Sequence, residues 1–318
     1  MTRPSLLPSR RRAFRASLVA GAACLAIACL AAPSAWADDP KLLGACSETD
    51  LRAEPYAEWF ESGYDGYEPH AEVLAELKTL LAEADGIDIT VFFGTWCGDS
   101  RRQVPRFLRL LKDAGFPADK IDIVAVDNDD ALHKRSPDGE EVGKHIFRVP
   151  TLIVSRGGDE IGRIVEHPVR SLERDLRGIL KGDGPAPAYR SYPLIIDWYE
   201  NGLLSDSNVD PSGLAMDLRA LGITESELWS VSRVLRSRGE ADEALKVQQV
   251  SCDLHRTSLC SSRLALALFQ AGSMEDALEE AENGLGRLQE PAVDTAEHAG
   301  ILLEIVKEAQ AAISSPEP

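Results

Sequence analysis

The chain has 318 residues, of which 44% are hydrophobic and 27% are charged, and this length is sufficient for two domains that each bury a core. Lys and Arg number 34 against 52 Asp and Glu, giving a formal charge of −18 at pH 7. A surface this acidic repels phosphate backbones, which excludes nucleic acid as a favoured partner. After residue 37, no segment is apolar enough to span a bilayer.

The first 37 residues have the pattern of a secretory signal peptide. Four arginines between positions 10 and 15 precede an apolar run over 16–32, and Ala35-Trp36-Ala37 has small residues where signal peptidase reads them. We therefore predict cleavage after Ala37 and a periplasmic or secreted protein without a membrane anchor. An uncleaved anchor and a lipoprotein attached at Cys29 are the less favoured alternatives.

The export route stays open. Arg11-Arg12-Ala13-Phe14 resembles the twin-arginine signal, which carries folded proteins, but the match is only four residues long. Export of the unfolded chain is equally compatible with this n-region.

Residues 38–182 alternate between helical and strand patterns after an irregular start. Residues 38–68, rich in Pro, Gly and Tyr, predict an irregular N-terminal extension. Within 69–182, apolar spacing predicts helices over 69–85, after Ser100 and over about 170–180, and strands over 87–93, 121–126, 149–154 and 160–165. Strands joined by helices and closed by a hairpin at Gly157-Gly158 predict an α/β layered domain.

A short motif follows the first of these buried strands. It is Trp96-Cys97-Gly98-Asp99-Ser100, with Pro105 eight residues after the cysteine and Val149-Pro150-Thr151 opening a later strand. In these features, residues 69–182 resemble the thioredoxin-like superfamily. The resemblance implies that Cys97 is a nucleophile, that Pro150 is cis beside its sulfur, and that Trp96, Val149, Pro150 and Thr151 form a groove for an extended substrate strand.

The expected position of Cys97 favours its thiolate, which is the species that attacks a disulfide. A cysteine between a strand and the N-terminus of a helix lies at the positive end of the helix dipole. Arg101 and Arg102 favour the thiolate further, whereas the carboxylate of Asp99 opposes it.

Two positions depart from thioredoxin. Ser100 replaces the second cysteine of C-x-x-C, and Val91 stands where thioredoxins carry a buried Asp that serves that cysteine. Monothiol glutaredoxins and the C-x-x-S members of the protein disulfide isomerase group are similar in having one thiol. The resemblance therefore implies a monothiol oxidoreductase or isomerase without a bound cofactor. Its mixed disulfides would be resolved by glutathione, by another thiol protein or by Cys46.

Four cysteines remain after removal of the signal peptide: Cys46, Cys97, Cys252 and Cys260. An exported protein meets an oxidising compartment, where pairing is expected. Cys252 and Cys260 are eight residues apart at a predicted helix–turn–helix junction, so we predict a structural disulfide between them.

The remaining chain predicts a second, helical domain. Residues 183–191 have the composition of a linker, and residues 192–318 show helical spacing throughout. Residues 238–245 recur 33 residues later as 271–278, and this pattern is similar to a degenerate pair of tetratricopeptide repeats. A plain helical bundle is the alternative.

Two functions are compatible with these patterns. The first is an exported thioredoxin-like protein that exchanges disulfides through Cys97, with exported proteins or a partner thiol protein as substrates. The alternative is a non-catalytic adaptor that holds a protein partner in its groove and helical repeats.

The six histidines show no metal-ligand spacing, so no metal site is predicted.

Overall fold

The computed structural model describes residues 40–288 and 295–314. The predicted signal peptide, residues 1–37, lies outside the described residues. None of the described helices combines the length and the apolar character that crossing a bilayer requires.

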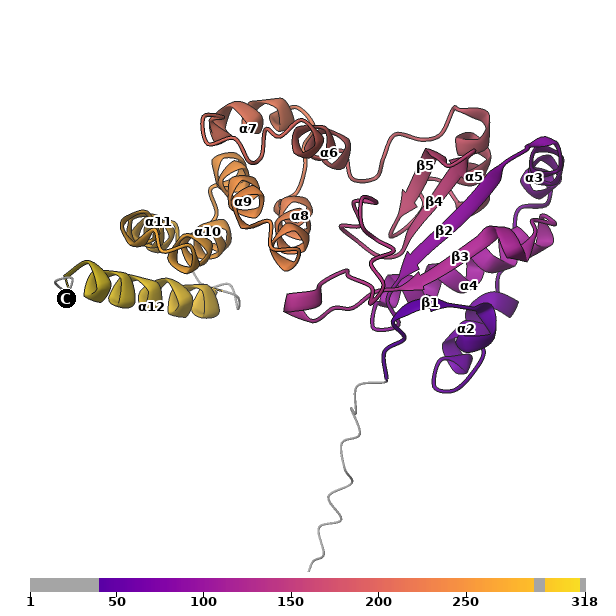
Figure 1. The fold of residues 1–318 in the computed structure, drawn as a ribbon, viewed down its shortest axis with the longest axis horizontal. Coiled ribbons are helices and arrows are strands. Elements are labelled where there is room, and N and C mark those ends of the chain that lie inside the picture. The colour runs from indigo at the N-terminus through magenta and orange to yellow at the C-terminus, as the bar shows by residue number, and fades with distance from the viewer. Residues whose placement is uncertain (1–39, 289–294, 315–318) are drawn as a thin grey trace, which may run out of the picture. The chain divides into compact units, whose positions relative to one another are not determined.

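Five strands form one mixed sheet in the order β1-β3-β2-β4-β5 (Figure 1). They are β1 (Gly44–Cys46), β2 (Ile87–Phe93), β3 (Ile121–Ala125), β4 (Thr151–Arg156) and β5 (Asp159–Val165). Only the β2–β3 pair is parallel, and the three other pairs are antiparallel. The four strands predicted between 87 and 165 are confirmed, with bounds that differ by no more than two residues.

The helices of this α/β region pack against one face of the sheet. They are α1 (Glu48–Leu51), α2 (Ala57–Asp65), α3 (Ala71–Glu83), α4 (Gly98–Asp113) and α5 (Leu172–Lys181). Two short 3-10 helices lie in the connections, η1 (Ala118–Lys120) before β3 and η2 (Asp130–Leu132) between β3 and β4. We call the cluster on this face the helical-face core; in it Phe60 of α2, Phe107 of α4 and Leu176 of α5 are buried with Val91 and Phe93 of β2.

The opposite face of the sheet carries a smaller cluster, which we call the loop-face core. Phe92, Val124 and Ile153 of the sheet are buried there with Ile146 and Val149, which belong to the long connection between β3 and β4. Trp96 and Cys97 pack against the edge of this cluster. The loop-face core therefore carries the cysteine singled out by the sequence.

The prediction of an irregular segment over 38–68 was wrong. β1 pairs with the outer edge of β3, with Gly44 opposite Ala125, and α2 buries Phe60 and Tyr64 in the helical-face core. A three-residue strand has almost no pattern of its own, because its partner supplies the pairing. In α2 the helical spacing of the aromatic residues was hidden by the Pro and Gly residues around it.

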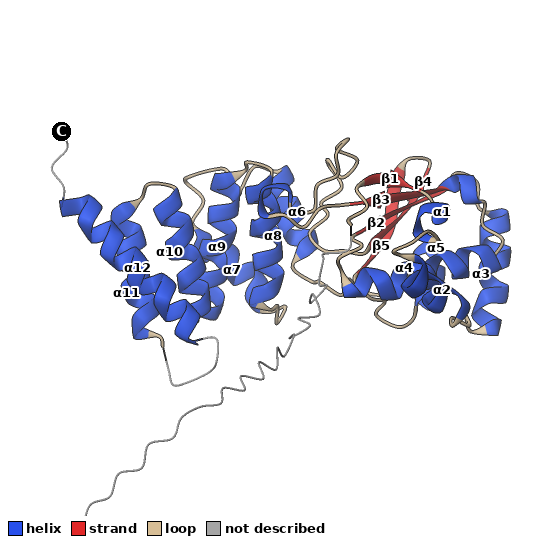
Figure 2. Cartoon of the chain, turned by 90° about the horizontal axis from the view of Figure 1, so that it is seen from below, coloured by secondary structure: helices blue, strands red, loops and turns tan. Residues whose placement is uncertain are grey.

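After residue 182 every regular element in the described ranges is a helix (Figure 2). These helices are α6 (Tyr192–Glu200), α7 (Pro211–Arg219), α8 (Glu225–Ser237), α9 (Ala241–His255), α10 (Ser258–Gln270), α11 (Met274–Gly286) and α12 (Thr295–Ser314). The predicted linker, 183–191, contains neither helix nor strand. The helical nature of this region is thus confirmed.

The internal similarity corresponds to two equivalent turns. Gly239 between α8 and α9 and Gly272 between α10 and α11 have φ values of 84° and 82°, a left-handed conformation that glycine adopts without strain. In each turn the residue after the glycine donates its N–H to a carbonyl five residues earlier, at 3.0 Å.

The predicted disulfide is also present, and Cys252–Cys260 joins the end of α9 to the start of α10.

The segment before β4 is held by the first helices of the helical region. Phe147 is 3% exposed, shares a core cluster with Leu228 of α8, and its ring centroid lies 5.1 Å from that of Tyr192. Arg148 Nε donates to the Tyr192 hydroxyl at 2.8 Å, and Arg148 Nη2 donates to the Ser226 carbonyl at 2.8 Å. These contacts fix the chain immediately upstream of Val149.

Gly63 of α2 tests the packing of α2 on α4, and Gly213 of α7 is the control at an open position. A Cβ on Gly63 would lie 2.6 Å from Cγ of Pro105, a ring that cannot rotate away, so Gly63→Ala should lower the free energy of unfolding by about 1–3 kcal/mol. A Cβ on Gly213 of α7 would meet nothing within 4 Å, so Gly213→Ala should raise it by about 0.5–1 kcal/mol. Urea denaturation measures both changes, and a stabilising Gly63→Ala would contradict this packing.

Candidate functional site

Cys97 lies where the chain leaves β2 and enters α4. It is the N-cap residue of α4, its backbone N–H donates to Gly94 O at 2.9 Å, and its side chain is half-buried. The thiol therefore lies beside the unpaired N–H groups at the start of a 16-residue helix. Its Sγ donates to the carbonyl of Val149 at 3.2 Å.

The chain around Val149 is held by hydrogen bonds on both sides. The Val149–Pro150 peptide bond is cis, as predicted. The Thr151 hydroxyl donates to Arg148 O at 2.7 Å, and Glu166 N donates to Pro150 O at 2.7 Å. Arg148 O thus accepts from a side chain and Pro150 O from a backbone N–H, and the Val149 carbonyl between them accepts from the Cys97 thiol.

Trp96, which precedes the thiol in the chain, is held by a hydrogen bond of its own. Its indole Nε1 donates to Val126 O at 2.9 Å, which anchors the ring over the end of β3. Trp96, Cys97 and Val149 all contact the loop-face core. Trp96 and Val149 are thus the implied groove residues that share this cluster with the thiol.

Ser100 has a structural partner. Its side chain is fully buried, and its Oγ accepts a hydrogen bond from Gly94 N at 3.2 Å, across the turn that leads into α4. Val91 is fully buried in the helical-face core. The thiol therefore has neither a second cysteine in its own helix nor a carboxylate at position 91.

The charges of the first helical turn largely compensate one another. Arg102 Nη2 lies 2.6 Å from Asp99 Oδ1, and Arg101 Nε donates to Thr95 O at 2.5 Å. The expected support of the thiolate by Arg102 is thus balanced by its partner carboxylate.

Lys134 is a residue of this site that sequence reasoning missed. It follows η2 with a φ of 61°, it is 7% exposed, and its Nζ lies 4.1 Å from the centroid of the Trp96 ring. Burial lowers the pKa of Lys134 to about 8, and the negative charge of Cys97 opposes that shift. Residues 127–148 are largely polar, and nothing in their pattern marks one lysine as buried.

Cys46 is located elsewhere. It pairs with Ile123 in the β1–β3 ladder, its Sγ lies 3.6 Å from Ile123 O, and it packs against the helical-face core. Burial raises the pKa of Cys46 to about 12, with a smaller contribution from the Asp50 carboxylate. Cys46 and Cys97 are both free thiols and pack against clusters on opposite faces of the sheet.

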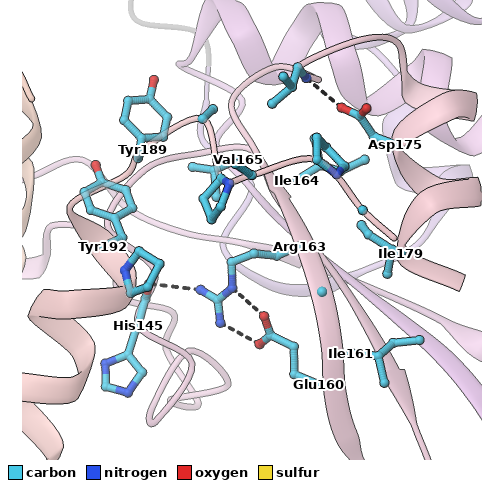
Figure 3. Close-up of a pocket in the computed structure, with 18 of the residues that line it drawn as sticks. His145, Glu160, Ile161, Arg163, Ile164, Val165, Asp175, Ile179, Tyr189 and Tyr192 are labelled. Atoms are coloured by element: carbon cyan, nitrogen blue, oxygen red, sulfur yellow. Dashed lines mark hydrogen bonds and ion pairs between the residues drawn. The ribbon is translucent and has the colours of Figure 1, made fainter. Parts of the chain in front are cut away.

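A cavity of about 600 Å³ lies apart from the thiol, between β5, residues 182–189 and α6 (Figure 3). Arg163 crosses it and pairs with Glu160 through two bonds of 2.6 and 2.5 Å, and its Nη1 donates to Lys144 O at 3.0 Å. His145 and Tyr192 also line it. None of the site residues predicted from the sequence does.

No protein-family model, no curated protein and no solved structure matches the chain. Within 40–288 and 295–314, no group of three or more His, Cys, Asp or Glu side chains is arranged to hold a metal ion. The chemistry of the site must therefore be inferred from its own geometry.

The burial of Lys134 should cost stability at neutral pH. Its ammonium titrates at about 8 in the folded chain against an ordinary value of 10.5, so the unfolded state binds the proton more tightly. In a Cys97→Ser background, Lys134→Met should therefore raise the free energy of unfolding at pH 7 by about 1–3 kcal/mol, less the small cation–π energy with Trp96.

This gain should shrink as the pH rises from about 8 to 10.5, because the Lys134 amine is then neutral in the folded state and progressively loses its proton in the unfolded state as well. Urea denaturation of both chains at pH 7 and at pH 10 measures the difference. A gain of equal size at the two pH values would contradict the burial of a charged amine at this position. Lys144→Met, at an exposed position, should have little effect.

Proposed function

We propose that this chain is an exported thioredoxin-like protein that carries out thiol–disulfide exchange with Cys97 as its single nucleophile. The observation that carries the proposal is the thiol at the N-terminus of α4, 3.2 Å from the carbonyl that precedes the cis proline. This is the arrangement that the resemblance implies for a thiol that receives an extended substrate strand.

The exchange balances without an external oxidant. The Cys97 thiolate attacks one sulfur of a substrate disulfide, a Cys97–substrate disulfide forms, and the other substrate sulfur leaves as a thiolate. A second thiolate then attacks the substrate sulfur of this mixed disulfide, forms a new disulfide with it and releases the Cys97 thiolate. Cys97 is unchanged after the cycle, and one disulfide has been exchanged for another.

Formation of the mixed disulfide frees a hydrogen-bond acceptor. Once Cys97 Sγ is bonded to a second sulfur it has no proton to donate, so the Val149 carbonyl loses its present partner. An extended substrate segment that brings its sulfur to Cys97 can donate a backbone N–H to that carbonyl. The covalent step and strand recognition would then occur at one place.

Two features of Cys46 favour an external source for the second thiolate. A thiol whose pKa is about 12 is almost entirely protonated at neutral pH and attacks slowly. Cys46 also packs on the face of the sheet opposite to Cys97. We therefore assign the resolving step to glutathione or to a partner thiol protein.

A single substitution tests the monothiol chemistry. Wild-type protein mixed with a disulfide-containing substrate such as insulin should give mixed disulfides that persist on a non-reducing gel until a small thiol is added. Ser100→Cys should shorten their lifetime by about tenfold or more, because it supplies an intramolecular resolving thiol. The rate should stay below that of thioredoxin, since Val91 provides no proton acceptor.

Ser100→Ala is the matched control, because it removes the same hydroxyl from Gly94 N without adding a thiol, and it should leave the lifetime unchanged. Cys97→Ser should give no adduct. If Ser100→Cys has no effect while Cys46→Ser prolongs the adducts, Cys46 is the resolving thiol and the monothiol proposal is wrong.

A non-catalytic binding or adaptor protein is the second candidate. The cavity along β5 favours a binding role, since its volume of about 600 Å³ is in the range of small-molecule sites and no thiol lines it. An adaptor should still bind its partner after Cys97→Ser, whereas an exchange protein should lose its substrates. Absence of any adduct from wild-type protein would leave the adaptor as the better function.

Export is part of the same proposal and has its own test. Protein recovered from the extracytoplasmic fraction of an expressing cell should begin at Asp38, as determined by N-terminal sequencing. Lys substitution of both Arg11 and Arg12 should block export only if the twin-arginine route is used.

A further inference from the structure

The side chain of Lys134 is only 7% exposed, and among the described residues its ammonium has no acidic partner. Within the described residues its Nζ makes neither a hydrogen bond nor an ion pair, and it lies over the Trp96 ring, 4.1 Å from the ring centroid. Burying an unpaired cation is costly, and a buried charge is usually paired. A residue adjacent to Trp96 in the chain, Cys97, can supply the missing anion.

The other charges near Lys134 are already engaged. Arg148 is paired with Glu166 at 3.1 Å, and Arg233 of α8 is paired with Asp130 at 2.5 Å. The Tyr189 hydroxyl also donates to Glu166. Arg148 and Arg233 weaken the proton affinity of Lys134, whereas Cys97 and Glu166 strengthen it, and Cys97 has the largest effect of these four groups.

We propose that Lys134 is a positioning residue whose ammonium stabilises the Cys97 thiolate, and the proposal rests on the proposed function in that this thiolate is the attacking species. A lysine suits this position because its charge is compact and its stem can be buried. The hydrogen bond from Sγ to Val149 O holds the sulfur while it is protonated, and the ammonium holds it once it has ionised.

The interaction between the Lys134 ammonium and the Cys97 thiolate would affect both steps of the exchange. A stabilised thiolate is more abundant at neutral pH, which speeds attack on a substrate disulfide. It is also a better leaving group when an external thiol attacks the mixed disulfide. Lys134 thus compensates in part for the absence of a resolving cysteine at position 100.

The pH dependence of Cys97 alkylation tests this role. In a Cys46→Ala background Cys97 is the single free thiol of the described chain, and its rate of reaction with iodoacetamide is measured from pH 5 to 10. Lys134→Met should reduce the rate at pH 7 by about threefold to tenfold and move the half-maximal rate to higher pH. Lys134→Arg should keep most of the wild-type rate, and Lys144→Met should match wild type.

A profile for folded Lys134→Met that superimposes on the wild-type profile would overturn the proposal. If that variant does not fold, the reciprocal measurement decides. In protein labelled with ¹³C at lysine Cε, the Lys134 amine should titrate at lower pH in Cys97→Ser than in wild type, because the thiolate that raises its proton affinity is gone. An equal midpoint in the two proteins would refute the interaction.

These outcomes separate this proposal from the proposed function. If alkylation depends on Lys134 but no substrate adduct forms, the ion pair exists and the exchange function fails. If adducts form at a rate that does not depend on Lys134, the exchange function stands and Lys134 has no part in it.

Discussion

The hydrogen bond from Cys97 Sγ to Val149 O depends on the register of the sheet. β2 and β4 are antiparallel neighbours with Phe92 opposite Thr151, so the chain that leaves β2 and the chain that enters β4 emerge side by side. Cys97 is five residues after Phe92, and Val149 is two before Thr151. A slip of one residue in this pairing would turn Phe92 out of the loop-face core and carry Val149 away from the thiol.

The helices after residue 191 hold the chain next to Val149 in place. Arg148 joins the turn before β4 to Tyr192 of α6 and to Ser226 in α8, while its guanidinium also pairs with Glu166 beyond β5. Three separate segments of the chain therefore converge on the residue next to Val149. The helices after residue 191 have a structural role at the thiol whatever partner they bind.

The sequence alone predicts those features that a local pattern of residues specifies. β2 is a continuous apolar run and α4 is strongly amphipathic, so both are recognisable alone, and the spacing of Cys252 and Cys260 suffices to predict their pairing. β1 was missed because three residues become a strand only beside β3. Lys134 was missed for the same kind of reason, since Trp96, its contact, is 38 residues away in the chain.

Val91 and Lys134 show how a single-thiol site differs from a dithiol site. A dithiol enzyme needs a proton acceptor for its second thiol, and the resemblance places that acceptor at position 91, on the helical face. In this chain that position is apolar and fully buried, and Ser100 has nothing to ionise. In the exchange that we propose, one thiol acts first as attacker and later as leaving group, and both steps favour a stable anion. A cation meets that need in the proposed mechanism, and the cation that we propose is Lys134, which lies over the ring of Trp96 and away from Val91.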